Sequence, residues 1–341
     1  MNLIPSKNVL VRAEGVVPGA GENDYVLRLD NSSLSRFQEC NRAGEYYLVK
    51  RRDVPKSSPL VAGSALHEGL EYLYKHGVDQ TNLVMAKQRA SEIYLGETFR
   101  EDWRTLDLVL GALDGYVSQY QGNDPFKLIE HNGAPLVETA FEVPMGEIYV
   151  GRELPYGRDY LLSDNSESDA TLYVNKLYTT WTGKIDLGIN LSGRLGVLDH
   201  KTTSMLGSTF FKQFQLGQQP LGYCFALSKI LEQPIAMFML NVIYWRPPRK
   251  NEHIGRTEFS REIFTYNQSH IDEWERDVME LVANYVTCLV KGYFPANRNH
   301  CINKYCVCPY HDVCTLPVKQ RDTLLNTNLY TDVTWDPTKK D

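Results

Sequence analysis

Two short apolar segments, each interrupted by one aspartate, are the feature that most constrains this chain. Asp186 lies within Gly183–Ile189, and thirteen residues later Asp199 lies within Val197–Thr203. Both segments have the composition of β-strands, and residues 191–194 between them are typical of a hairpin turn. If the two strands are paired neighbours, the carboxylates converge. Hard oxygen ligands that converge at a sheet edge are what Mg²⁺ or Mn²⁺ requires.

Lys201 follows Asp199 at a spacing that brings both side chains to one face of a strand, because successive side chains alternate. A metal held by two carboxylates would polarise a phosphoryl group and activate water, and the ammonium of Lys201 would orient that water and stabilise developing charge. The set therefore predicts phosphodiester hydrolysis. An isolated Asp-x-Lys pattern, however, more often reflects an acid that caps a turn and a lysine that solvates a sheet edge.

The remaining apolar pattern predicts a mixed α/β core with an inserted helical lobe. Helices are expected at 33–47 (with Ser32 or Ser33 as N-cap), from about Gly63, twice within 78–122, at 210–231 and at 270–290. Strands are expected at 136–143, 178–190, 195–201 and 236–245, the last buried on both faces. Residues 163–169 are expected to form a loop, and the final twenty residues to be loosely attached. The core order is thus helix, three strands, helix, strand.

Composition narrows the class of protein. The 341 residues are 43% hydrophobic and 23% charged, which is ordinary for a globular chain. No run approaches the ~20 apolar residues of a membrane span, and the first residues resemble neither a signal nor a transit peptide, so we expect an intracellular protein. The net charge of −6 disfavours a passive nucleic-acid coat but not an enzyme. Basic patches at 50–52 and at Arg246, Arg249 and Lys250 are interpreted as solvated surface.

The cysteines are unevenly distributed. Cys301, Cys306, Cys308 and Cys314 fall within fourteen residues, whereas Cys40, Cys224 and Cys288 stand apart. In an intracellular protein such clustering favours metal or cluster ligation over disulfides. Four local thiolates could hold tetrahedral zinc, although the paired C-x-x-C spacing of zinc ribbons is missing. Cys224 and Cys288 fit apolar helical patterns and are expected in the core.

Taken together, these motifs resemble the PD-(D/E)xK nucleases, and within them the RecB-like exonucleases. That family carries G-x-x-x-H on its first helix (here Gly63–His67), G-x-x-D (Gly183–Asp186), D-x-K with threonines (Asp199–Thr203) and Q-x-x-x-Y (Gln219–Tyr223). Its αβββαβ core matches the order predicted above. The resemblance implies a nuclease domain over 33–314 between an N-terminal extension, 1–32, and a C-terminal tail, 315–341. A helical insertion at about 78–130 and a C-terminal helix with the cysteine cluster at 270–314 complete it.

The resemblance also implies roles for single residues. Metal ligands would be His67, Asp186, Asp199 and the backbone carbonyl of His200, and Lys201 would orient the attacking water. Gln219 and Tyr223 would support the site and its DNA strand. Glu138 occupies a position where many members also have a glutamate. Pro220, inside the Q-x-x-x-Y motif, is compatible with a helix only near its first turn.

Iron–sulfur members of this family place one cysteine before the nuclease core and three after it, the last two as C-P-Y-x-x-x-C. Residues 308–314 match that run, and Cys40 matches the upstream position. The resemblance therefore implies a [4Fe–4S] cluster held by Cys40, Cys301, Cys308 and Cys314, with Cys306 as the alternate ligand and zinc as the alternative metal.

The expected function is that of a Mg²⁺- or Mn²⁺-dependent DNA exonuclease. By family analogy it would act on single strands or free ends in replication, recombination or repair, with a virus and its host cytoplasm among the settings. Two rivals remain at this point. The first is a non-catalytic DNA-binding module, with iron–sulfur or zinc, on the same fold, and the second is a small-molecule metalloenzyme that uses the same acids. No membrane association is expected.

Overall fold

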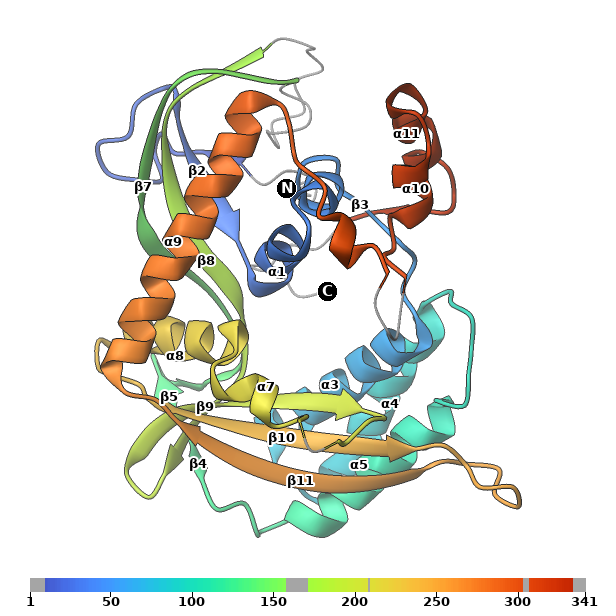
Figure 1. Cartoon of the computed structure of the whole chain (residues 1–341). Coiled ribbons are helices and arrows are strands. Elements are labelled where there is room, and N and C mark those ends of the chain that lie inside the picture. The colour runs from blue at the N-terminus through green and yellow to red at the C-terminus, as the bar shows by residue number, and fades with distance from the viewer. Residues whose placement is uncertain (1–9, 158–170, 208, 303–306, 334–341) are drawn as a thin grey trace. The chain divides into compact units, whose positions relative to one another are not determined.

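The computed structural model describes residues 10–157, 171–207, 209–302 and 307–333 (Figure 1). The chain forms two compact units. The first comprises Met1–Pro55, Ala140–Gly183 and Asp272–Asp341, and the second comprises Lys56–Thr139 and Lys184–Ile271. The long strands β7 (Val137–Gly157) and β8 (Thr171–Leu191) contribute to both. The loop expected at 163–169 lies outside the described residues.

The second unit contains the predicted order of elements. These are α3 (Ser58–His76), the start of β7, the end of β8, β9 (Arg194–Thr203), α8 (Gln218–Leu231) and β10 (Met237–Arg246). β8 and β9 run antiparallel, β9 and β10 run parallel, and β11 (Arg256–Thr265) adds an antiparallel edge (Figure 1). This mixed sheet with its helices confirms the predicted α/β, PD-(D/E)xK-like fold class. The unit also contains α4 (Gln80–Gly96), α5 (Leu106–Tyr120), α7 (Lys212–Gln215), β4 (Lys127–Leu128), β5 (Glu130–His131) and β6 (Ala134–Pro135).

Local sequence explains the two connections that hold the sheet together. Ser192 and Gly193 adopt φ angles of 53° and 89°, as a tight hairpin requires, and the Asn190 side chain accepts the Gly193 N–H at 2.8 Å. β9 and β10 are parallel, so the chain must cross over between them, and α8 makes that crossover. The sheet therefore has Asp186 and Asp199 on adjacent strands, as predicted.

The core of the second unit lies between the sheet and α3, α4 and α5. Leu66, Leu70 and Leu73 of α3 are 1% exposed or less and pack with Leu198 of β9 and Met239 of β10, among others. Side chains alternate along β9, so Leu198 and His200 share this buried face, whereas Asp199 and Lys201 project from the other. The site residues on β9 are thereby divided between the two faces of the sheet.

The first unit contains the remaining elements. They are β1 (Leu10–Arg12), β2 (Asp24–Leu29), α1 (Asn31–Glu39), α2 (Asn41–Gly44), the π-helical turn η1 (Glu45–Val49), β3 (Arg52–Asp53), α9 (Gln268–Lys291) from Asp272 onward, the 3₁₀ turn η2 (Arg298–His300), α10 (His311–Thr315), α11 (Val318–Leu325) and β12 (Thr331–Asp332). Helix α9 confirms the helix predicted at 270–290 and packs Trp274 against Trp181 of β8, with ring centroids 5.2 Å apart. None of the described helices is long and apolar enough to cross a membrane.

Several predicted helix boundaries were wrong. Asp30, and not Ser32 or Ser33, caps α1, because its carboxylate accepts the N–H groups of both serines. The helix expected at 33–47 is interrupted at Cys40, which has an extended backbone. Helix α3 begins at Ser58, earlier than expected, with Pro59 in its first turn, where proline is tolerated. The helix predicted at 210–231 is divided into α7 and α8. Pro220 therefore lies in the first turn of α8, the part of a helix that tolerates proline.

Sequence periodicity missed strands β1, β2 and β11. β11 is an edge strand whose residues are mostly partly or fully exposed, so its sequence is polar and lacks an apolar run. The described part of the final twenty residues, which ends at Val333, is less loosely attached than expected, because β12 pairs with β3. Arg52 donates to the Leu325 carbonyl at 2.7 Å, and only 15% of its side chain is exposed, so the 50–52 patch is not simply solvated surface. Arg246 and Glu258, by contrast, form an exposed pair.

Gly196 offers a direct test of the parallel register that positions β9. A Cβ at this position would lie 2.5 Å from the Met237 carbonyl oxygen of the paired strand. Gly196→Ala should therefore lower the free energy of unfolding by about 1–3 kcal/mol through overpacking. The matched control is Gly111→Ala, on the exposed surface of α5 with no atom within 4 Å of the added Cβ. It should be about 0.5–1 kcal/mol more stable than the parent. Chemical denaturation of the three proteins measures both changes, and equal stability of the two variants would contradict the register.

Candidate functional site

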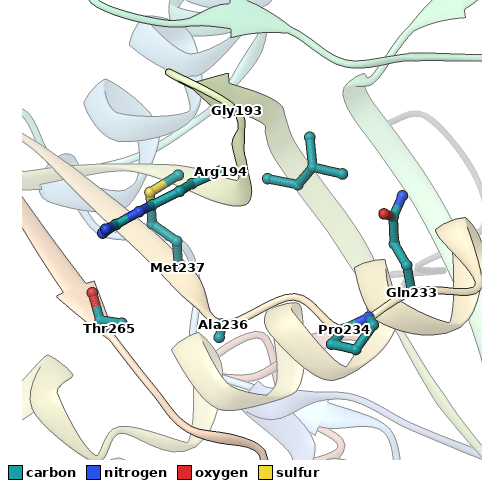
Figure 2. Close-up of a pocket in the computed structure, with 8 residues that line it drawn as sticks. Gly193, Arg194, Gln233, Pro234, Ala236, Met237 and Thr265 are labelled. Atoms are coloured by element: carbon teal, nitrogen blue, oxygen red, sulfur yellow. The ribbon is translucent and has the colours of Figure 1, made fainter.

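An open pocket of about 440 Å³ lies where the β8–β9 turn meets the start of β10 and the end of β11 (Figure 2). Its lining contains one charged side chain, Arg194, together with neighbouring residues such as Gln233, Pro234 and Thr265. None of the residues predicted for the site lines it. Its chemistry therefore gives no reason to assign a reaction to this pocket, and the candidate site lies elsewhere in the second unit.

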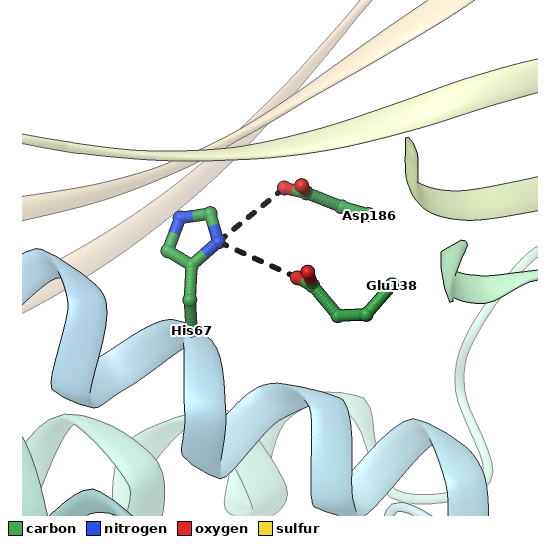
Figure 3. A group of neighbouring side chains, drawn as sticks. All are labelled: His67, Glu138 and Asp186. Atoms are coloured by element: carbon green, nitrogen blue, oxygen red, sulfur yellow. Dashed lines mark ion pairs between the residues drawn. The ribbon is translucent and has the colours of Figure 1, made fainter. Parts of the chain in front are cut away.

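Three side chains from three different elements converge beside the sheet (Figure 3). His67 projects from α3, Glu138 from the start of β7 and Asp186 from β8. The Nδ1 atom of His67 lies 3.5 Å from Asp186 Oδ2 and 3.8 Å from Glu138 Oε1. One ligand atom of each residue lies within 4.8 Å of the others, which is close enough for a shared metal ion. One nitrogen and two carboxylates are a donor set suited to Mg²⁺ or Mn²⁺.

Glu138 reaches this group from an unusual backbone conformation. Its φ angle is 47°, in the left-handed region that non-glycine residues rarely adopt and that costs about 1–3 kcal/mol. Directly beside it, Val137 is buried in the core. Backbone strain of this kind is concentrated at functional sites, where the surrounding structure enforces it. The structure thus places the Glu138 carboxylate beside His67 and Asp186. The sequence had indicated only that many members of the resembling family also have a glutamate at this position.

Asp199 and Lys201 form a second, adjacent group. The Lys201 Nζ atom lies 2.9 Å from Oδ1 and 2.8 Å from Oδ2 of Asp199, which is 1% exposed. Both side chains project from one face of β9, as predicted. Among the described residues, Asp199 does not belong to the close three-residue group of His67, Glu138 and Asp186. Its carboxylate is instead engaged by the ammonium group.

His200 connects the two groups through its backbone. Its N–H donates to Asp186 Oδ2 at 2.7 Å and so helps to orient that carboxylate. The imidazole points to the opposite, buried face, where its Nδ1 atom lies 2.6 Å from the Asn241 amide nitrogen. Burial, reinforced by the positive charges of His67, Arg261 and Lys201, lowers the pKa of His200, so its ring is neutral. The residue therefore contacts Asp186 through its backbone, while its ring lies on the buried face of the sheet.

The electrostatics of the site favour a bound cation. Burial raises the pKa of Asp186, and it raises the pKa of Asp199 to about 6 against the opposing effect of Lys201. Burial opposes charge on His67, but Asp186 and Glu138 outweigh it and raise the pKa of the imidazole to about 9. Burial also opposes charge on Lys201, yet Asp199 and Asp186 raise the pKa of its ammonium. To bind a metal, His67 must give up the second proton of its imidazole, and three carboxylates and one ammonium then leave two negative charges, which a divalent cation would neutralise.

Gln219 and Tyr223 lie on the first turns of α8. The Gln219 side-chain amide donates to the Tyr223 hydroxyl at 2.9 Å. Burial raises the pKa of Tyr223, and the negative charges of Asp199 and Asp186 add to the rise. Gln219 and Tyr223 are thus joined across one turn of α8, as the spacing of the Q-x-x-x-Y motif on a helix allows.

The four cysteines of the predicted cluster all lie in the first unit, where Cys40, Cys308 and Cys314 pack into one buried cluster. Cys40 follows α1, and its sulfur accepts the Asn297 N–H at 3.3 Å. The Cys308 N–H donates to the Cys301 carbonyl at 2.9 Å. Burial raises the pKa of the Cys308 thiol, and the neighbouring Cys40, Cys314 and Cys301 add to the rise. Cysteines from both ends of the chain therefore lie in one part of the fold, although among the described residues no three of them have sulfur atoms within 4.8 Å of one another. Cys306 lies outside the described residues. Cys224 and Cys288 are buried, as predicted.

Comparison with known structures and proteins gives the following relatives. A Eubacterium rectale protein that is provisionally named an exonuclease aligns with 11% identity and a TM-score of 0.43, over 85% of this chain and 94% of its own. A second structure, of the protein SSO0001, aligns with 12% identity and a TM-score of 0.23, over 66% of this chain and 75% of its own. Similarities this weak carry no weight for fold or activity. No curated protein shows significant sequence similarity to the chain.

The family comparison is decisive. Residues 29–315 match the model of the PD-(D/E)XK nuclease superfamily. This match spans most of the chain and includes every residue of the site described above. The chain therefore belongs to the PD-(D/E)XK nuclease superfamily.

Proposed function

We propose that this chain is a metal-dependent deoxyribonuclease that hydrolyses DNA phosphodiester bonds with Mg²⁺ or Mn²⁺. The observation that carries the proposal is the convergence of His67, Glu138 and Asp186 beside the Asp199–Lys201 pair. Membership of a nuclease superfamily supports hydrolysis of nucleic acid, and the donor set supports the choice of metal. We further propose that the enzyme is an exonuclease of the RecB-like branch, on the order and spacing of its motifs.

In this proposal the metal is held by His67 and Asp186, with Asp199 and the backbone carbonyl of His200 as further ligands. The proximity of Glu138 to His67 supports adding it to this set. A divalent metal supplies Lewis acidity toward the phosphoryl group and lowers the pKa of bound water. The buried surroundings of the two aspartates strengthen their attraction for such an ion, because few water molecules compete for it.

The protein's own residues would then orient and stabilise the reacting groups. Lys201, kept protonated by its carboxylate neighbours, would orient the attacking water and stabilise the negative charge that develops on the phosphoryl oxygens. Tyr223, held by Gln219, would contact the DNA strand next to the scissile phosphate. The resemblance to RecB-like enzymes supports action on single strands or free ends, in replication, recombination or repair.

Substitution at the Asp199–Lys201 pair tests the assigned chemistry. Asp199→Asn and Lys201→Ala should each lower the rate of DNA hydrolysis in Mg²⁺ or Mn²⁺ by at least about 100-fold, because each removes a charge that acts on the transition state. The matched controls are Asp114→Asn and Lys87→Ala, which disrupt an exposed ion pair on α5 and α4. These controls should keep the parent rate.

The form of the DNA separates the competing functions. End-labelled linear single strands should be degraded, whereas circular single strands should resist an exonuclease. Parent-like digestion by Asp199→Asn and Lys201→Ala would show that the assigned site is wrong. Salt-sensitive binding of DNA by the parent without hydrolysis would favour a non-catalytic DNA-binding module, and neither binding nor hydrolysis would favour a small-molecule metalloenzyme.

We also propose a [4Fe–4S] cluster held by Cys40, Cys301, Cys308 and Cys314, with Cys306 as the alternate fourth ligand and zinc as the alternative metal. The packing of Cys40, Cys308 and Cys314 in one cluster, with the Cys308 N–H bonded to the Cys301 carbonyl, supports the proposal, because such iron–sulfur clusters are held by four thiolates. The N–H group that Asn297 donates to Cys40 is also of the kind that stabilises a cluster thiolate. The role of the cluster would be structural, joining segments from the two ends of the chain.

Metal content tests this cluster. The parent protein, purified without oxygen, should be brown and contain about four iron and four labile sulfide atoms per chain. Cys40→Ser should lose most of this iron, whereas Cys288→Ser, which alters a buried cysteine outside the set, should retain it. Comparison of Cys301→Ser with Cys306→Ser identifies the fourth ligand. A colourless parent protein with stoichiometric zinc would contradict the iron–sulfur assignment.

A further inference from the structure

A row of three polar side chains crosses the sheet of the second unit behind the proposed metal site. His200 on β9 lies opposite Asn241 on β10, and Asn241 lies opposite Arg261 on β11. His200 and Asn241 are 2% and 0% exposed, and only 11% of the Arg261 side chain is exposed. Buried polar residues are costly unless they are fully paired, so the contacts of this row need an explanation.

Arg261 is held by every nitrogen of its guanidinium group. Its Nε atom donates to Asn241 Oδ1 at 3.0 Å, and one terminal nitrogen donates to Asp124 at 2.7 Å. The other terminal nitrogen donates to the hydroxyls of Tyr74 at 3.3 Å and Tyr116 at 3.0 Å. The guanidinium also lies 3.7 Å from the centre of the Tyr120 ring. These contacts together fix the position of the Arg261 guanidinium group.

That position determines how the Asn241 amide is oriented. Arg261 can only donate, so the amide oxygen of Asn241 must face it, and the amide nitrogen must face His200. The amide nitrogen lies 2.6 Å from His200 Nδ1, which must therefore accept the hydrogen bond. A neutral ring then carries its proton on Nε2. Among the described residues this atom is buried without a hydrogen-bond partner, so the contact with Asn241 is the polar restraint on the ring.

Ring contacts complete the restraint. The His200 ring stacks on Tyr74, with centroids 5.7 Å apart, and contacts the edge-on ring of His67, with centroids 5.8 Å apart. Its backbone N–H holds Asp186 at 2.7 Å. Asn241 thus fixes the ring of His200. The backbone N–H of His200 contacts Asp186 and its ring contacts His67, both of which are proposed metal ligands.

We propose that Arg261 and Asn241 are positioning residues that orient His200, and through it Asp186 and His67, for metal binding. This inference rests on the proposed metal site and deepens it, because neither residue touches metal or substrate. A buried, paired arginine is a poor source of stability, since well-packed apolar residues often replace such groups at little cost. The orientation that Arg261 imposes on Asn241 accounts for a buried cation at this position. Hydrogen-bond partners of metal ligands typically change metal affinity 10–100-fold when they are altered.

Mn²⁺ affinity, measured by electron paramagnetic resonance on the full chain, tests the proposal independently of activity. Arg261→Lys keeps the charge beside Asp124 but loses the planar fork, and Asn241→Asp keeps the partner of Arg261 but removes the donor to His200. Each variant should bind Mn²⁺ at least about 10-fold more weakly. The matched control, Arg246→Lys, alters an exposed arginine of β10 and should bind within twofold of the parent.

Two further outcomes keep the test decisive. If the variants fold and bind Mn²⁺ like the parent, the positioning role is wrong while the proposed nuclease site stands. Both proposals fail if the parent does not bind Mn²⁺, or if Asp186→Asn binds Mn²⁺ as tightly as the parent does.

A second measurement, ¹⁵N NMR of the parent protein, needs no variant. The Nδ1 atom of His200 should carry no proton, because it accepts a hydrogen bond from Asn241, and a proton on Nδ1 would overturn the proposal even if the variants failed to fold.

Discussion

The burial of Asp186 and Asp199 in a largely apolar sheet is the constraint on which the second unit depends. A carboxylate removed from water loses several kcal/mol of solvation unless partners replace the water. Asp199 receives Lys201 from its own strand, and Asp186 receives the His200 N–H and the His67 ring. Each of these partners must itself be held in position by a helix or strand. His67 lies on α3, Lys201 and His200 lie on β9, and the His200 ring is hydrogen-bonded from β10, so all three elements contribute to holding the two acids.

Two further features show that this arrangement is maintained at the expense of stability. Glu138 holds a left-handed backbone at the start of β7, which costs about 1–3 kcal/mol, and Arg261 is a buried cation. Neither is needed to build a mixed sheet. Both are explained if the fold maintains a group of carboxylates that a divalent metal neutralises. The superfamily to which the chain belongs hydrolyses nucleic acid, which is consistent with that reading of the site.

Much of this arrangement could be predicted from sequence, and the failures have physical causes. Asp186, Asp199 and Lys201 were recognisable because charged residues interrupt apolar strands, and strand alternation then placed Asp199 and Lys201 on one face. Helix α3 was recognisable from its leucine stripe, but its start was not, because proline signals both loops and first helical turns.

The residues behind the site were harder to recognise. Asn241 lies in a strand that is otherwise almost entirely apolar, which was a signal, but its partner Arg261 lies on an edge strand whose polar sequence resembles a loop. The strain at Glu138 depends on tertiary packing and leaves no mark in the local sequence. Cys40 was paired with the distant cysteines by family resemblance alone, since no local pattern links positions so far apart.

The most direct test of the central claim is the position of Mn²⁺ in crystals of the protein, located by its anomalous scattering. The account predicts a single strong peak within coordination distance of His67 and Asp186, next to Asp199. The same peak should be absent from crystals of Asp186→Asn. A Mn²⁺ ion bound elsewhere in the second unit, with the carboxylates of Asp186 and Asp199 left uncoordinated, would contradict it.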